Sequence, residues 1–176
     1  IGIIGAGSWG IALSILLYNN GNKVTVWSVI EDEIKMLNEK REHERCLPGV
    51  KLPDDMVFTT DLEHTIKNAE LLVLAVPSVY TRSTSKSMSG YVREGQIIVN
   101  VAKGIEENTL KTLTQIIEEE IPCADVAALS GPSHAEEVSR SIPTTCVVAA
   151  HSRETAEYIQ NIFMSEKFRV YTTPDI

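Results

Sequence analysis

The sequence predicts an α/β fold in which a doubly wound, mostly parallel sheet carries helices on both faces. Short runs rich in β-branched residues alternate with helix-like stretches along the whole chain. Alternation of this kind is typical of parallel sheets, because the connection between two parallel strands usually contains a helix. A second observation is the run Gly-Ala-Gly-Ser-Trp-Gly at residues 5–10, between the first apolar run and the first helix-like stretch. Glycines at a first strand–helix junction favour a Rossmann-like sheet.

The first half of the chain contains four predicted strands and four predicted helices. The first strand ends at the glycines, and the helix after it ends at Gly21-Asn22, a typical C-terminal turn. Asp61 is an expected N-cap, and Pro77 ends an apolar run that we expect to be a buried strand. The expected strands are 1–4, 23–27, 56–59 and 71–76, and the expected helices are 9–20, 31–40, 61–67 and 79–88.

The second half continues the alternation. After Gly131 and Pro132 we expect Ser133 to cap a short helix, with Glu136 at its third position completing a capping box. No repeat, low-complexity tract or linker is present, so residues 1–176 are expected to form one domain. The expected strands are 96–101, 125–129, 144–149 and 168–171, and the expected helices are 108–120, a short one after Ser133, and 153–163.

The composition is acidic and excludes several classes of function. Among 176 residues, 16 are Lys or Arg and 24 are Asp or Glu, and no basic block occurs, so we expect no nucleic-acid partner. The apolar stretch 11–17 lacks a basic lead-in, so we do not expect it to be a signal peptide, and no run reaches the about 20 apolar residues of a membrane span. Cys46, Cys123 and Cys146 have no paired spacing, which favours reduced thiols in a cytoplasmic protein. The histidines lack ligand spacing, so no metal is expected.

The glycine run predicts a dinucleotide site for NAD or NADP. Gly5 would allow the tight turn, Gly7 would let a pyrophosphate approach the backbone, and Gly10 would let the helix pack closely. The helix N-terminus would add free N–H groups and a partial positive charge. In such sites an acid about 20 residues further on usually holds the ribose. Here the second strand is followed by Ser28 and Val29, no acid comes before Glu31, and no Lys or Arg stands there, so cofactor preference stays open.

Two further motifs lie at predicted strand ends. Lys103 follows a buried strand, at the sheet edge where ligands bind in this fold class, although a surface lysine is the simpler interpretation from the residue alone. The run Ser-Gly-Pro-Ser at residues 130–133 could present Gly131 and Ser133 to a ligand at the same edge. This run also approximates a nucleophile elbow, but no histidine stands in a suitable late loop, which disfavours a hydrolase.

Together these motifs resemble bacterial-type NAD(P)-dependent glycerol-3-phosphate dehydrogenase, and the resemblance runs the length of the chain. The resemblance implies reversible hydride transfer between dihydroxyacetone phosphate and sn-glycerol 3-phosphate, in the cytoplasm, in supply of phospholipid backbones. It also implies a homodimer for the full-length protein. The matching segments are 5–10 with 12–13, 26–27, 47–53, 75–78, 103–106, 130–133 with 135 and 137–138, 143–144, 168–171 and 174–175.

The resemblance also assigns roles to residues. Ser8 and Trp9 would contact the dinucleotide, together with Ala135 and the pair Ser28 and Val29 at the end of the second strand. Lys103 would lie between cofactor and substrate, which makes its role in binding the favoured interpretation. Gly131 and Ser133 would touch the substrate. Two departures from the family pattern are Ser28-Val29, where a basic residue or histidine often stands, and Cys46, where an aromatic residue is usual.

The general acid/base lysine of this family is expected beyond Ile176, in a helical C-terminal substrate domain. We therefore expect residues 1–176 to be the dinucleotide-binding domain, to bind dinucleotide weakly and to turn nothing over. A non-catalytic Rossmann module that senses dinucleotide or mediates assembly is the alternative, since the same fold would serve it. A 3-hydroxyacid or 6-phosphogluconate-type dehydrogenase shares the glycine run but not the motifs around Lys103 and Ser133.

Overall fold

A single eight-stranded sheet runs through the structure, a computed structural model that describes all of residues 1–176. Its strand order is β3-β2-β1-β4-β5-β6-β7-β8. The six strands from β3 to β6 are parallel neighbours, β7 pairs antiparallel with β6, and β8 pairs parallel with β7. The strand order reverses between β1 and β4: the chain runs outward from β1 to β3 on one side of this point and outward from β4 to β8 on the other. The predicted doubly wound, Rossmann-like sheet is confirmed.

The strands are short, and those at the centre are buried on both faces. They are β1 (Gly2–Ile4), β2 (Thr25–Trp27), β3 (Val57–Thr59), β4 (Leu71–Leu74), β5 (Ile97–Asn100), β6 (Asp125–Ser130), β7 (Thr144–Ala150) and β8 (Phe168–Thr173). Every residue of β4 is buried, which explains why its sequence is a continuous apolar run without polar alternation.

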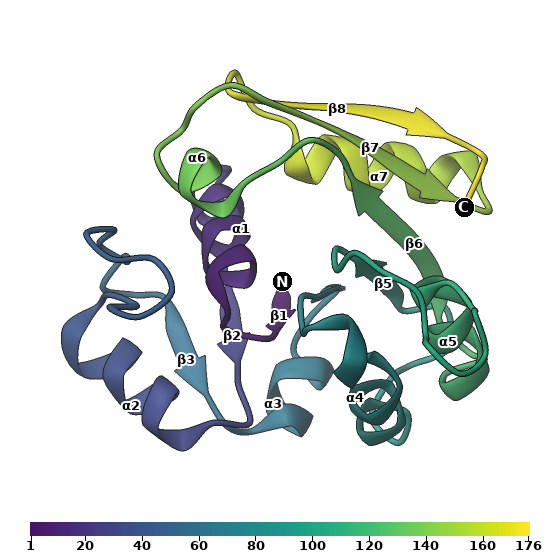
Figure 1. The fold of residues 1–176 in the computed structure, drawn as a ribbon, viewed down its shortest axis with the longest axis horizontal. Helices are drawn as coiled ribbons and strands as arrows, with labels where there is room; N and C mark the ends of the chain where they lie inside the picture. The colour runs from purple at the N-terminus through teal and green to yellow at the C-terminus, as the bar shows by residue number, and fades with distance from the viewer.

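Seven α-helices connect or flank these strands, as Figure 1 shows. They are α1 (Ser8–Asn19), α2 (Glu31–Lys40), α3 (Leu62–Lys67), α4 (Thr81–Met88), α5 (Leu113–Glu120), α6 (Ala135–Ser139) and α7 (Arg153–Phe163), with a 3₁₀ turn, η1, at Ser78–Tyr80. The predicted bounds of α2 and α7 are confirmed to the residue. No helix in the structure is both long and apolar enough to cross a membrane.

Two hydrophobic clusters cover the two faces of the sheet. The larger contains buried residues of α1, α2, α6 and α7, and the smaller contains those of α3, α4 and α5. Neighbouring residues of one strand point to opposite clusters: Ile3 belongs to the larger and Ile4 to the smaller. This alternation is the side-chain period of a strand. Figure 1 shows α3, α4 and α5 grouped together, apart from α6, which sits beside α1.

Three local predictions are wrong, and all concern helix starts. Helix α4 begins at Thr81 and not at residue 79, because Ser78–Tyr80 form the 3₁₀ turn η1. Helix α5 begins at Leu113 and not at residue 108, because Thr112 forms a capping box with Gln115 and Ile105 bridges back to Thr112. Helix α6 begins at Ala135 with His134 as its N-cap residue, so Ser133 forms no capping box with Glu136. The Ser133 hydroxyl donates to the Gly131 carbonyl instead. Asp61 does cap α3, where its side chain accepts from the His64 N–H at 2.8 Å.

Candidate functional site

The turn between β1 and α1 contains three glycines with different surroundings. Gly5 has a φ of +117°, and a Cβ there would stand 2.9 Å from the carbonyl of Ala75. A Cβ on Gly10 would lie 2.1 Å from the Gly5 carbonyl oxygen, so the helix can follow the turn this closely only without a side chain. A Cβ on Gly7 would meet nothing within 4 Å. Gly5 and Gly10 therefore serve the packing of the turn, whereas Gly7 borders open space.

The N-terminus of α1 faces this open space. Gly7 is the N-cap residue, and it has no side chain with which to cap the helix. The first backbone bond into the helix runs from the Ile11 N–H to the Gly7 carbonyl at 2.9 Å. The N–H groups of the preceding helical residues therefore have no helical acceptor, and with the helix dipole they favour an anion. The turn fits the pyrophosphate of a dinucleotide, because the space beside Gly7 is open to such a group.

A cleft of about 440 Å³ lies over the turn, at the carboxyl ends of the central strands. Ligands bind at this edge of open α/β sheets, where the strand order reverses. The walls come from the start of α1, the segments after β4 and β5, and the start of α6. The lining residues are Gly7, Ser8, Trp9, Ala75, Val76, Pro77, Ser78, Val101, Ala102, Lys103, Ser133, His134, Ala135 and Glu136.

Lys103 spans the cleft from the end of β5 to the loop after β6. Its Nζ donates to the Gly131 carbonyl oxygen at 2.9 Å, and the Ser133 Oγ donates to the same oxygen at 3.4 Å. An ammonium group has three protons, so this bond leaves others for a ligand. A Cβ on Gly131 would lie 2.6 Å from the Thr145 carbonyl oxygen and 2.9 Å from the Cα of Cys146. The loop can therefore rest directly on β7 only with glycine at this position.

The backbone that carries Lys103 is held on both sides. Asn100, 5% exposed at the end of β5, donates from Nδ2 to the Ala102 carbonyl at 3.0 Å and accepts from the Ala102 N–H at 3.4 Å. Gly104 has a φ of +132°, and a Cβ there would lie 3.2 Å from the Ser78 side chain. The backbone on both sides of Lys103 is thus fixed, by the hydrogen bonds of Asn100 before it and by the close approach of Gly104 to Ser78 after it.

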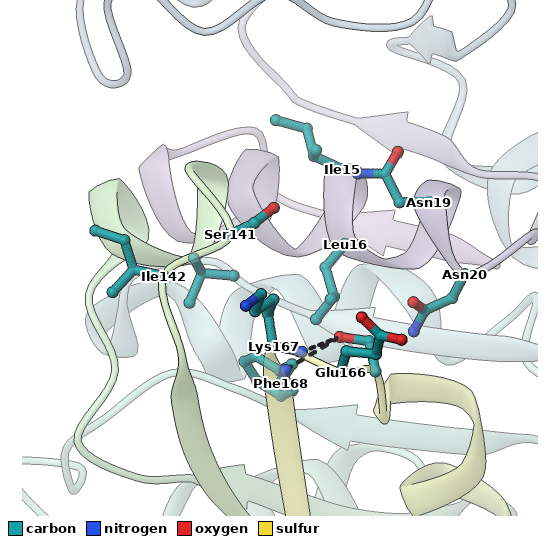
Figure 2. A pocket seen from close by; sticks show the side chains of 11 residues that line it. Ile15, Leu16, Asn19, Asn20, Ser141, Ile142, Glu166, Lys167 and Phe168 are labelled. Carbon is teal, nitrogen blue, oxygen red and sulfur yellow. Dashed lines mark hydrogen bonds between the residues drawn. The ribbon is translucent and has the colours of Figure 1, made fainter.

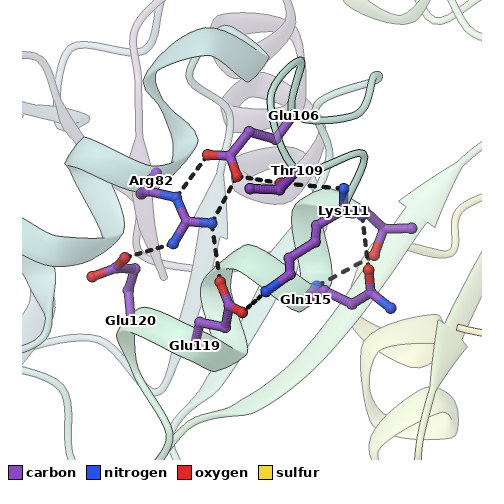
Figure 3. A network of polar contacts seen from close by, with 8 residues as sticks. Arg82, Glu106, Thr109, Lys111, Gln115, Glu119 and Glu120 are labelled. Atoms are coloured by element: carbon purple, nitrogen blue, oxygen red, sulfur yellow. Dashed lines mark hydrogen bonds and ion pairs between the residues drawn. The ribbon is translucent and has the colours of Figure 1, made fainter.

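A network of ion pairs fixes the segment that follows Lys103 (Figure 3). Arg82 on α4 holds both oxygens of Glu106, at 2.6 and 2.7 Å, and also contacts Glu120 at 2.7 Å and Glu119 at 3.0 Å. The Thr109 hydroxyl donates to Glu106 as well. These bonds lower the pKa of Glu106 to about 2, with the bond from Arg82 as the largest cause. The network therefore joins the Lys103 loop to α4 and α5.

The carboxyl end of β2 carries a second polar cluster. The Ser28 Oγ, 4% exposed, donates to Glu33 Oε2 at 2.5 Å and accepts from the Ile30 N–H at 3.2 Å. The other oxygen, Oε1, lies 2.9 Å from Nε2 of His43, whose Nδ1 accepts from the Cys46 N–H at 3.2 Å. The acid at this strand end is therefore Glu33, two residues beyond the first acid of the sequence.

The three cysteines are free in the structure. Burial raises the pKa of the Cys46 thiol, which also lies near the carboxylate of Glu33. Burial likewise raises the pKa of Cys146, beneath the Gly131 loop. Both groups are therefore in the unreactive thiol form at neutral pH.

A second cavity, of about 250 Å³, lies away from the glycine turn (Figure 2). Residues from the second half of α1, the end of α6 and the turn before β8 line it, among them Leu16, Ile142 and Phe168. Within its wall the Ser165 Oγ accepts from the N–H groups of Lys167 and Phe168. Asn20 donates to the carbonyl of Ile162, in the last turn of α7, and to that of Met164, directly after this helix. These bonds hold the end of α7 and the turn before β8 against α1, which favours a structural role for Asn20 and Ser165.

The structure brings most of the predicted site residues to one cleft, but not all of them. Gly5 and Gly10 lie beneath it, and Gly131 contributes its carbonyl. Ser28 and Val29 do not line the cleft. Ser28 is buried and donates its proton to Glu33, and Val29 is 73% exposed. The predicted residues that line the cleft are Gly7, Ser8, Trp9, Lys103, Ser133 and Ala135.

The residue-by-residue predictions did not name several groups that line the cleft or the β2 end. Residues 75–78 and 101–102 directly follow β4 and β5, so their position after central strands was the available signal. His134 and Glu136 come with the start of α6. Glu33 and His43 are 10 residues apart and meet only in the folded chain, so no spacing rule identifies them.

Comparison with known proteins places these features in a family. The family model described as "NAD-dependent glycerol-3-phosphate dehydrogenase N-terminus" matches residues 1–156. A glycerol-3-phosphate dehydrogenase [NAD(P)+] from Agathobacter rectalis is 64% identical over 176 residues, which are all of this chain and 52% of that protein. One from Fusobacterium nucleatum is 54% identical over 178 residues, covering 100% of this chain and 53% of that protein.

A solved structure agrees. The crystal structure of glycerol-3-phosphate dehydrogenase from Coxiella burnetii superposes with a TM-score of 0.94 at 27% identity, over 99% of this chain and 54% of that chain. The chain spans about half the length of the curated relatives it matches.

Proposed function

This chain belongs to the NAD-dependent glycerol-3-phosphate dehydrogenase N-terminus family, and on that basis we propose that it forms the cofactor side of an enzyme that interconverts dihydroxyacetone phosphate and sn-glycerol 3-phosphate. The observation that carries the proposal is a single cleft at the reversal of strand order, bordered by an uncapped helix N-terminus on one side and by Lys103 on the other. The helix N-terminus suits the pyrophosphate of a dinucleotide, and the Lys103 ammonium suits the oxygen atoms of the substrate.

In this proposal the start of α1 binds the dinucleotide. The N–H groups of its first turn would hold the pyrophosphate, and Gly7 would leave room for it. Trp9, partly buried against the larger cluster, and Ala135 would line the cofactor side of the cleft. Either NAD or NADP satisfies these contacts, since none of them reaches the adenosine ribose.

Lys103 and the loop after β6 form the substrate side. The nicotinamide ring of the bound cofactor supplies the hydride for ketone reduction and accepts it in the reverse direction. With one N–H bonded to Gly131, the Lys103 ammonium would donate a second hydrogen bond to the C2 oxygen of dihydroxyacetone phosphate. Its charge would stabilise the negative charge that develops on that oxygen during reduction of the ketone. Ser133, next to Gly131, would position the substrate through its hydroxyl.

Complete turnover also requires a proton donor for the new alcohol and groups that hold the phosphate. We assign these groups to a helical C-terminal domain, as expected from the resemblance, and propose that residues 1–176 alone bind dinucleotide weakly without turnover. Location in the cytoplasm, a homodimeric full-length protein and supply of glycerophospholipid backbones belong to the same proposal.

Replacement of Lys103 by Met in the full-length protein tests the substrate side. We expect kcat/KM for dihydroxyacetone phosphate to fall by about 100-fold or more, because loss of one such electrostatic donor has that order of effect. The dinucleotide Kd should change far less, since the start of α1 is untouched. Lys86→Met, which removes an exposed charge from α4, is the matched control. Unchanged kcat/KM in Lys103→Met would remove Lys103 from the mechanism.

A further inference from the structure

We infer that Glu33, held by Ser28 and His43 at the end of β2, makes this site favour the ribose hydroxyl of NAD over the 2′-phosphate of NADP. The inference rests on the proposed dinucleotide function. It goes beyond the cleft contacts described above, which fit both forms.

The position of Ser28 connects the cluster to the adenosine end of the cofactor. Strand β2 is the parallel neighbour of β1, and the N–H of Gly5 donates to the Trp27 carbonyl at 2.9 Å. Ser28, the first residue after β2, therefore lies immediately beside the glycine turn. Proteins of this fold class bind the adenosine ribose of the cofactor at this place. The exposed apolar side chains of Val29 and Ile30, 73% and 54% exposed, follow it.

The hydrogen bonds of Ser28 determine what it can offer a ligand. A serine hydroxyl has one proton and two lone pairs. The proton is donated to Glu33, and one lone pair accepts from the Ile30 N–H. The one remaining position is an acceptor. A ribose 2′-hydroxyl can donate to it, whereas a 2′-phosphate, itself rich in acceptors, gains no bond.

The hydrogen bonds of His43 determine the charge of the cluster. Because Nδ1 accepts from the Cys46 N–H, the proton of the ring is on Nε2, which donates to Glu33. A second proton on Nδ1 would break the bond to Cys46, so this arrangement requires a neutral imidazole. The His43 side chain is 2% exposed and Glu33 is 15% exposed. Each oxygen of Glu33 then accepts one hydrogen bond, from Ser28 or from His43, as the oxygens of a carboxylate do, and the cluster contains no cation of its own.

Basic side chains near the cluster compensate this charge weakly. Glu33, His43 and Cys46 line a pocket of about 410 Å³ that also includes Lys35, Lys40, Glu44 and Arg45. Lys40 is paired with Glu44 on the surface. Lys35 and Arg45 are exposed, where water and salt screen their attraction for a phosphate. The mostly buried carboxylate therefore dominates the preference.

Titration of the full-length protein with NADH and NADPH, followed by intrinsic fluorescence, tests the inference without relying on turnover. We expect NADH to bind at least about tenfold more tightly than NADPH, the order of effect of one like-charge repulsion of about 1.4 kcal/mol. In Glu33→Gln the ratio of the two Kd values should shrink at least fivefold, mainly through tighter NADPH binding. Glu31→Gln removes an equal charge from the same exposed helix turn without contact to Ser28, and its ratio should stay within about twofold of wild type.

Each outcome decides between the alternatives. Three results would overturn the inference while leaving the proposed function intact. These are equal affinities of the wild type for NADH and NADPH, an unchanged ratio of the two Kd values in Glu33→Gln, and a wild type that binds NADPH more tightly than NADH through Arg45, as shown by loss of that preference in Arg45→Ala. Failure of both nucleotides to bind would instead overturn the proposed function. Should Glu33→Gln fold poorly by circular dichroism, competition of ADP-ribose against 2′-phospho-ADP-ribose on the wild type gives the same answer, with preference for ADP-ribose expected.

Discussion

Gly7 and Gly10 stand three residues apart in one turn, yet a methyl group would meet open space at the first and the Gly5 carbonyl oxygen at the second. The same residue type therefore has two unrelated roles. Gly10 permits the close approach of α1 to the turn, and Gly7 keeps the helix N-terminus accessible to a ligand. At the residue scale, folding and binding can thus be separated experimentally.

Gly10→Ala should destabilise the protein by several kcal/mol or prevent folding, because the clash is with backbone that cannot move aside. Gly7→Ala should lower the free energy of unfolding by no more than about 1 kcal/mol, the usual range for an N-cap change. It should nevertheless weaken NADH binding at least tenfold, because its methyl group occupies the space proposed for the pyrophosphate. Denaturant unfolding and NADH titration measure the two effects.

Gly90→Ala is the control for Gly7→Ala, since it adds a methyl group in open space away from the cleft. Wild-type NADH affinity in Gly7→Ala would show that the space beside Gly7 is not the nucleotide site.

The segment from Lys103 to Thr112 shows how an element without regular secondary structure is fixed. Its ends meet through the bridge between Ile105 and Thr112, and the Glu106 N–H donates to the Lys111 carbonyl at 2.9 Å. Arg82 then ties Glu106 to α4, and its own pKa is raised by Glu106 and Glu120. The segment is thus held both by backbone bonds between its ends and by the ion pairs of Arg82.

This ion-pair network predicts a pH dependence of stability. The pKa of Glu106 is about 2 in the folded protein and near its ordinary value of 4.5 when unfolded. A lowered folded pKa means that the stabilisation is fully present above about pH 4.5 and is lost as the pH falls toward 2. The thermal midpoint of Glu106→Gln should therefore fall less steeply than that of the wild type across this interval.

Glu107→Gln provides the comparison, because Glu107 is the exposed neighbour and has no ion-pair partner in the structure. Parallel pH curves for wild type and Glu106→Gln would contradict the assignment of the acid dependence to Arg82 and Glu106.

The whole molecule is organised as one sheet between two hydrophobic clusters of unequal size. The central strands belong to both clusters, since alternate side chains of β1, β4 and β5 enter opposite faces. Neither face can lose its packing without disturbing strands that the other face needs. At this scale we expect the two faces to unfold together.

The two tryptophans can test this coupling, because Trp9 packs against the larger cluster and Trp27 belongs to the smaller. Ile98→Ala, in the smaller cluster, should cost about 2–5 kcal/mol. We would measure the effect of Ile98→Ala twice, once in a Trp9→Phe background, where Trp27 reports, and once in a Trp27→Phe background, where Trp9 reports. The decrease in the denaturation midpoint should be the same for both tryptophans. A shift seen by Trp27 alone would indicate that the faces unfold separately.

The sequence by itself determined the class of sheet and the type of each element. Hydrophobic period and glycine chemistry are local properties, and they located every strand, the bounds of α2 and α7, and the glycine turn before α1. Helix starts are harder to locate from the sequence, because several neighbouring residues can act as the N-cap. Thr112 caps α5, five residues into the segment where we expected this helix, and His134 rather than Ser133 is the N-cap residue of α6. Lys103 was placed at the correct sheet edge, since the residue follows a parallel strand directly.

Only the tertiary structure decided which distant side chains meet. Arg82 reaches Glu106 across 24 positions, and Glu33 meets His43 across 10. The sequence around Ser28 leaves the cofactor preference open, but in the folded chain the proton of Ser28 is already donated to Glu33. The physical reason is that hydrogen-bond capacity is a property of the residue type, whereas its use depends on the neighbours that folding brings within reach.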